Sequence, residues 1–79
     1  MTQREYGRCT GLMVDAIVHA KRSIEYYAEA RDDKTLTDTE RQIKELQGQN
    51  ALGYAEGINQ ALAVIGFKHE KMKELGNLI

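Results

Sequence analysis

The sequence predicts an all-α protein, an antiparallel two-helix hairpin with a possible short third helix, assembling as a homo-oligomeric helical bundle. Apolar residues recur every three or four positions in both halves of the chain, as on one face of a helix. Proline is absent throughout. A short polar segment ending in a helix-start signal separates the two halves, and a connection this short makes the flanking helices antiparallel neighbours.

The first helix is expected over residues 3–32 or over residues 11–32. Thr2 with Glu5 three positions later has the pattern of a capping box, which favours the earlier start. Two glycines in the next turns lower helix propensity and favour the later start: Gly7 and Gly11. Beyond them the periodicity is clear, with an apolar face built from Leu12, Met13, Ala16, Ile17, Ala20, Ser23, Ile24, Tyr27 and Ala30.

Residues 33–37 are expected to form the turn, and residues 38–65 the second helix. Aspartates at positions 32 and 33 oppose the dipole at the end of a helix, so the first helix should end there. Thr37 and Glu40 repeat the capping-box spacing and mark the start of the second helix. This is the most specific local signal in the chain.

The second helix contains the least charged part of the sequence, residues 46–67, whose single formal charge is Glu56. On a helical wheel, seven residues fall in one narrow line, which we call the central stripe: Ile43, Leu46, Asn50, Gly53, Gly57, Ala61 and Val64. A broader apolar face lies beside it, formed by Tyr54, Ile58, Leu62 and Ile65. Two apolar surfaces are too wide for one contact, so we predict that the central stripe is an oligomer interface.

Glycines inside this helix have two interpretations. Gly48, Gly53 and Gly57 each cost about 1 kcal/mol relative to alanine in a helix. The spacing of Gly53, Gly57 and Ala61 would let another helix backbone approach closely and offset that cost. Alternatively, Gly48 or Gly53 marks a break between two shorter helices. Asn50 either fixes the register of an interface or lies at its rim.

Gly66 is expected to cap the second helix, with Phe67 folding back on its last turn. The C-terminal tail has helical spacing over residues 68–77, with Met72 and Leu75 on one side. It fits either a third short helix that packs across the hairpin or a continuation of the second helix.

Length and charge limit the classes of function. A single domain of 79 residues buries only about 60% of its unfolded surface, which favours self-association. The net charge of −1 recommends neither nucleic acid nor an anionic membrane as a partner. The lone Cys9 and the lack of a signal sequence or a long apolar run lead us to expect a soluble, cytoplasmic protein.

No catalytic or metal site is expected, and no cofactor. The two histidines, His19 and His69, lie in no nucleophile or metal-ligand motif. Asp15 lies one turn before His19, which suits a surface hydrogen bond. Arg22 and Tyr26 lie one turn apart at the rim of the first helix, and these residue types are common where a partner or ligand binds.

The expected function is therefore that of a small non-enzymatic protein which binds a protein partner as an adaptor, inhibitor or regulator. One alternative is an oligomer that binds or sequesters a small ligand in pockets between subunits, and another is a structural self-assembling protein. In size, and in its lack of a signal and of catalytic residues, the chain resembles the small helical accessory proteins of phages and other mobile elements. That resemblance rests on no alignable motif and would imply a location in the host cytoplasm.

Overall fold

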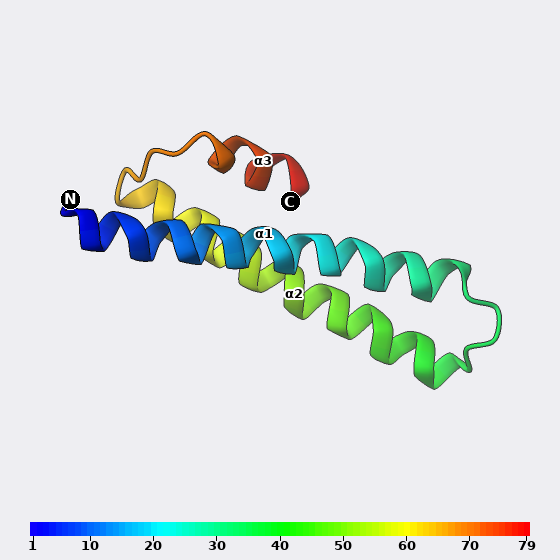
Figure 1. Cartoon of the computed structure of the whole chain (residues 1–79). Helices are drawn as coiled ribbons and strands as arrows, with labels where there is room; N and C mark the ends of the chain where they lie inside the picture. The colour runs from blue at the N-terminus through cyan, green and yellow to red at the C-terminus, as the bar shows by residue number, and fades with distance from the viewer.

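The protein is an α-helical hairpin with a short third helix, as a computed structural model covering residues 1–79 shows (Figure 1). Helix α1 spans Gln3–Asp32, α2 spans Asp38–Val64 and α3 spans Lys71–Leu78. The molecule is elongated, measuring 49 × 17 × 17 Å. The all-α fold, the antiparallel hairpin and the short third helix predicted from the sequence are thus confirmed.

Both long helices begin at a capping box. The Thr2 side chain accepts a hydrogen bond from the Glu5 amide, and the Glu5 carboxylate accepts one from the Thr2 amide. Thr37 and Glu40 make the same reciprocal pair at the start of α2. Helix α1 therefore starts at the earlier of its two expected positions, because the cap supplies partners for amides that would otherwise have none.

The turn between the long helices is held by Asp33 and Arg41. A carboxylate oxygen of Asp33 accepts hydrogen bonds from the amide and the hydroxyl of Thr35, at 2.9 and 2.6 Å. These bonds lower the pKa of Asp33. The Arg41 guanidinium donates to the carbonyl oxygens of Ala30 and Asp33, so it joins the end of α1 to the start of α2.

Helix α2 runs without interruption through its three glycines, which excludes a break at Gly48 or Gly53. The left-handed region is occupied only after the helix ends, at Gly66 with φ of 76°. The Phe67 amide then donates to the Leu62 carbonyl at 2.9 Å, and the Phe67 side chain is buried. The tail is consequently a separate helix, α3, which starts three residues later than the expected 68–77 segment.

The hairpin core is built largely from small side chains. Ala16 and Ala20 of α1 and Ala51 and Ala55 of α2 are buried, which allows the two backbones to lie close together. Larger residues complete the core near the end of α2, and the main cluster consists of Met13, Ala16, Ile17, Ala20, Ala55, Leu62, Phe67 and Leu75.

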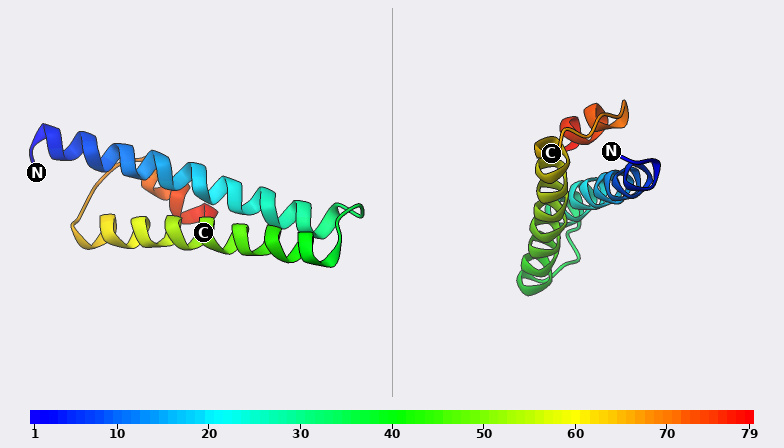
Figure 2. Two further views of the ribbon diagram at one scale, coloured as in Figure 1. Left: turned by 90° about the horizontal axis from the view of Figure 1, so that it is seen from below. Right: turned by 90° about the vertical axis from the view of Figure 1, so that its left-hand side faces the viewer.

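Helix α3 covers only one part of one side of the hairpin. Figures 1 and 2 show it beside the first half of α1 and the last half of α2, while the part next to the turn consists of two helices alone. Leu75 is fully buried and anchors α3 on the core. No other helix covers the side of the hairpin that faces away from α3 (Figure 2).

Candidate binding surfaces

The central stripe faces away from the rest of the chain. All seven of its residues are exposed, including Ile43 at 52%, Leu46 at 56% and Val64 at 79%. At about 100° per residue they lie roughly opposite Gly48, Ala51 and the other positions of α2 that pack on α1. Neither α1 nor α3 therefore covers this apolar line.

The glycines of α2 fall into two groups by their surroundings. A Cβ atom on Gly48 would lie 3.1 Å from a ring carbon of Tyr27, so this glycine permits a close approach within the hairpin. The Ser23 hydroxyl donates to the Gly48 carbonyl at 2.9 Å across the same contact. Nothing lies within 4 Å of a Cβ atom built on Gly53 or Gly57. No contact inside the chain explains these two glycines.

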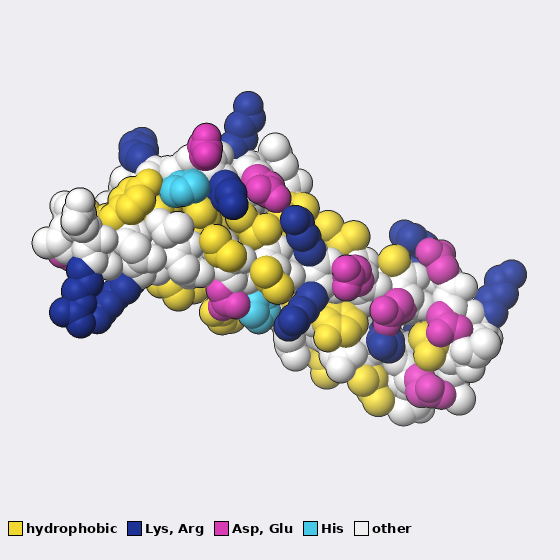
Figure 3. Space-filling model, in the orientation of Figure 1, with side chains coloured by type: hydrophobic (Ala, Val, Ile, Leu, Met, Phe, Trp, Pro, Cys, Tyr) yellow, Lys and Arg dark blue, Asp and Glu magenta, His cyan; other side chains and the backbone are white.

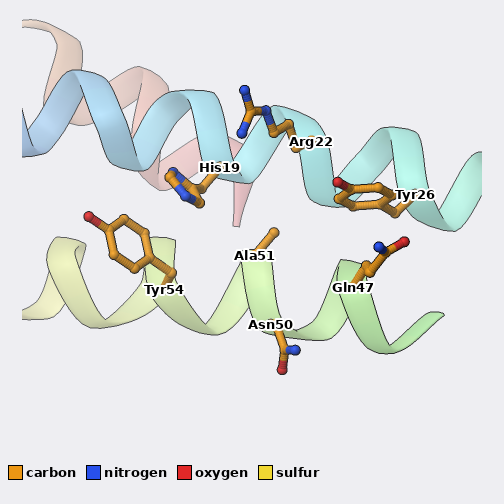
Figure 4. Close-up of a pocket in the computed structure, with 7 residues that line it drawn as sticks. All are labelled: His19, Arg22, Tyr26, Gln47, Asn50, Ala51 and Tyr54. Carbon is orange, nitrogen blue, oxygen red and sulfur yellow. The ribbon is translucent and has the colours of Figure 1, made fainter. Parts of the chain in front are cut away.

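An open groove lies between α1 and α2 next to the central stripe, with a volume of about 360 Å³ (Figure 4). Its lining comes from one face of each helix: His19, Arg22 and Tyr26 of α1, and Gln47, Asn50, Ala51 and Tyr54 of α2. Figure 4 shows Ala51 pointing toward α1, with the His19 and Tyr54 rings on one side of it and Tyr26 with Gln47 on the other. Ala51 therefore forms a small floor between two larger walls.

One wall of the groove is fixed by Asp15. Its carboxylate accepts a hydrogen bond from the Tyr54 hydroxyl, which raises the pKa of Tyr54. Nδ1 of His19 lies 2.8 Å from the Asp15 carbonyl oxygen, and because a carbonyl only accepts, Nδ1 carries the proton. The His19 and Tyr54 ring centroids are 4.2 Å apart. These contacts join residues that sequence reasoning treated separately.

The other wall of the groove is Tyr26, with Lys44 beside it. Lys44 Nζ lies 5.7 Å from the centroid of the Tyr26 ring and 2.7 Å from a carboxylate oxygen of Glu29. The hydrogen bond to Glu29 raises the pKa of Lys44. Arg22 lies on the rim, with its side chain turned away from α2 in Figure 4, and its guanidinium makes neither a hydrogen bond nor an ion pair.

The structure thus brings Arg22 and Tyr26 to one groove, and Asn50 belongs both to that groove and to the central stripe. Sequence reasoning did not assign Tyr54, Gln47 and Ala51 to a site with them. These three residues are separated by four, three and seven positions, so they lie on one face of α2. His19, Arg22 and Tyr26 have the same intervals on α1, and this shared spacing is the sequence signal that could have indicated the groove.

Few other features suggest chemistry. No group of three or more His, Cys, Asp or Glu side chains is placed to hold a metal ion. A second cavity near the turn, of about 450 Å³, is lined by Tyr27, Ala30, Arg31, Arg41 and Glu45. Acidic and basic side chains are interspersed over most of the face seen in Figure 3.

None of the three helices combines the length and the apolar character that crossing a bilayer requires. The central stripe and the groove are the two surfaces on which a functional argument can be built. No protein family, curated protein or solved structure matches this chain.

Proposed function

We propose that this chain is a non-enzymatic protein-binding protein, working as an adaptor, inhibitor or regulator, and that it self-associates through the central stripe. The observation that carries the proposal is the exposure of all seven stripe residues, with open space over Gly53 and Gly57. Each of these glycines costs about 1 kcal/mol of helix propensity. Close approach of a second helix backbone offsets that cost, whereas a free helix surface does not.

A second copy of the chain fits this surface. Five successive residues of the stripe, from Ile43 to Gly57, alternate in steps of three and four, which is the spacing of the seam in a coiled coil. A narrow apolar line of this kind suits one helix rather than a broad globular surface. Self-association through α2 also adds apolar burial to a chain with a small core.

An antiparallel arrangement matches the stripe better than a parallel one. In an antiparallel pair, a twofold axis would pass between Gly53 and Tyr54 of the two α2 helices. Each larger stripe residue of one copy would then face a smaller residue of the other copy. The facing pairs are Ile43 with Val64, Leu46 with Ala61 and Asn50 with Gly57. A parallel pair would instead place Ile43 and Leu46 against their own copies, and these large layers would hold the backbones apart. Gly53 and Gly57, also facing their own copies, would then leave gaps that weaken packing.

Charge at the ends of α2 favours the same direction. The first turn of α2 is acidic, with Asp38 and Glu40, whereas Lys68 follows its C-terminal end. Antiparallel pairing brings these opposite charges to the same level and aligns the helix dipoles favourably. We therefore propose a twofold dimer with α2 against α2, which presents further surfaces to a protein partner.

Cysteine cross-linking tests the arrangement. In a background with Cys9→Ser, we expect Leu46→Cys and Ala61→Cys chains to form a disulfide with each other when mixed and oxidised. Neither variant should cross-link efficiently to itself. Efficient self-cross-linking of Leu46→Cys would establish a parallel pair and overturn the antiparallel proposal.

Substitution of Gly57 tests whether the stripe is used at all. Gly57→Leu should abolish the dimer in sedimentation equilibrium, because the side chain occupies the space of the approaching helix. Gln60→Leu, an equally large change on the exposed polar face of α2, should leave the mass unchanged. If the unmodified chain sediments as a monomer at all concentrations and Gly57→Leu only stabilises it, the stripe is not a self-association surface.

A further inference from the structure

The groove centred on Ala51 has the dimensions and the lining of a small-molecule site. Its volume of about 360 Å³ lies within the range of roughly 300–1,000 Å³ typical of ligand pockets. Ala51 supplies a small apolar floor, and larger side chains rise on both sides of it (Figure 4). A ligand seated here would contact both long helices of the hairpin.

Flat rings dominate the walls. The His19 and Tyr54 rings pack together at 4.2 Å between centroids, and the hydrogen bond from Tyr54 to Asp15 holds this pair in place. Tyr26 provides a third ring on the other side of Ala51 (Figure 4). Faces and edges of aromatic rings interact favourably with other planar rings, so the walls suit a planar aromatic body.

Arg22 is the residue of the lining that favours a ligand with negative charge. Arg22 carries a guanidinium with no partner in the chain, and its planar fork matches carboxylate, phosphate or sulfonate groups. The charge of Glu29 is balanced by Lys44 at 2.7 Å, whereas Asp15 accepts from the neutral Tyr54 hydroxyl and remains an anion at the opposite wall of the groove. The Gln47 carboxamide on the α2 side makes no hydrogen bond within the chain and remains available to a ligand. Asn50 lies at the edge of the groove, and its side chain points away from α1 (Figure 4).

We propose that this groove binds a small planar aromatic molecule that carries an anionic group, with the rings of Tyr26, His19 and Tyr54 around its flat body and Arg22 on its anion. The Arg22 side chain swings from the rim toward the groove to make this contact, which costs little because nothing holds it elsewhere. The site goes beyond the proposed function and lies within a single chain, so it does not require the α2 dimer.

Two dyes that differ only in their charge test this proposal. The probes are 8-anilinonaphthalene-1-sulfonate and the uncharged N-phenyl-1-naphthylamine, which has the same aromatic body without the sulfonate. We expect the anionic dye to bind with one site per chain and Arg22→Gln to weaken it at least about tenfold, since a charge-assisted hydrogen bond is lost. Binding of the neutral dye should change less than about twofold.

Three further variants locate the dye. Gln47→Phe fills the groove from its exposed rim, without entering the core, and should abolish binding of both dyes. Arg4→Gln removes a charge from the exposed first turn of α1 and should have no effect, as should Val64→Ser on the central stripe. Circular dichroism and the melting temperature of each variant show that the fold is retained.

The proposal is overturned if neither dye binds, or if Arg22→Gln and Arg4→Gln weaken the anionic dye equally. It is also overturned if Val64→Ser removes the dye while Gln47→Phe does not, because the dye then lies on the stripe. Loss of dimerisation in Gly57→Leu with unchanged dye binding would support the groove independently of the proposed function.

Discussion

The ring of Tyr27 packs directly over the backbone of Gly48, where α1 and α2 approach each other. A Cβ atom at position 48 would lie 3.1 Å from Cε2 and 3.2 Å from Cδ2 of this ring. Ser23, one turn before Tyr27, donates its hydroxyl to the Gly48 carbonyl at 2.9 Å. Gly48 is thus buried by its own chain, unlike the two glycines that follow it in α2.

Alanine substitutions should separate these glycines by their effect on the stability of the monomer. At low protein concentration Gly53→Ala should stabilise the chain by about 0.5–1 kcal/mol, because helix propensity improves and nothing is displaced. Gly48→Ala should stabilise the chain less than Gly53→Ala, or should destabilise it, because the added methyl group meets the Tyr27 ring. Urea denaturation monitored by circular dichroism measures both changes.

A double-mutant cycle then identifies the cause. In a Tyr27→Leu background, Gly48→Ala and Gly53→Ala should change the free energy of unfolding by more similar amounts, since the obstructing ring is gone. If the difference persists unchanged, the Tyr27 ring is not what limits substitution at position 48.

Removing the Ser23 hydroxyl should cost stability. Ser23 is 2% exposed, and its hydrogen bond to Gly48 is the buried polar contact between the two long helices. We expect Ser23→Ala to lower the free energy of unfolding by about 1 kcal/mol. Thr10→Ala, which removes a local hydroxyl bond to the Tyr6 carbonyl, is the matched comparison and should cost less. Equal losses would contradict a special role for Ser23.

The capping residue of α2, Thr37, should contribute more to stability than the neighbouring Thr39. Thr37 accepts a hydrogen bond from the Glu40 amide at 3.1 Å, whereas Thr39 lies inside the first turn of the helix. Thr37→Ala should lower the free energy of unfolding by about 1 kcal/mol. Thr39→Ala should have little effect or should stabilise slightly, because alanine is the better helix former. Thermal unfolding of both variants decides between them.

The Tyr54–Asp15 contact should depend on pH in the alkaline range. Its hydrogen bond to Asp15 raises the pKa of Tyr54 above the ordinary value of 10.0. A raised pKa in the folded state means that the stabilisation is complete below the pKa of the unfolded chain. It is lost as pH rises through the higher folded pKa, because the phenolate repels the carboxylate.

Ring-carbon NMR titration can follow this tyrosine directly. Asp15→Asn should move the ionisation of Tyr54 to lower pH, since the negative charge that opposes it is removed. The other three tyrosines of the chain serve as internal references. An unchanged Tyr54 titration would mean that the contact with Asp15 does not persist in solution.

Local signals made the architecture predictable from the sequence. The boxes at Thr2 and Thr37 fix where the long helices begin, because each depends on residues three positions apart. Gly66 likewise lies where the chain takes a positive φ. What could not be predicted was which small residues of α2 pack on α1. Alanines at positions 51 and 55 bury against α1, although alanine contributes weakly to hydrophobic periodicity and the bulkier Ile43 and Leu46 remain outside.

The groove could be predicted only in part, for a related reason. Arg22 and Tyr26 stand out because both lie at the rim of the first helix in the sequence pattern. Their α2 neighbours depend on the rotation and register of the two helices, which are set by the fit of Tyr27 on Gly48 and by the alanines. The sequence placed Tyr54 on a broad apolar face, whereas its hydroxyl reaches Asp15 across the hairpin.

Because α3 covers only part of the hairpin, the two ends of the molecule should differ in local stability. The main core cluster gathers where α3, Phe67 and Leu62 meet α1, while the end next to the turn has only two helices to exclude water. Amide hydrogens near the turn should therefore exchange through local opening, at a lower free energy than those around Leu62. Ile43 and Leu46 of the central stripe lie in this less protected part of α2, so local opening should expose them while the core around Leu62 stays folded.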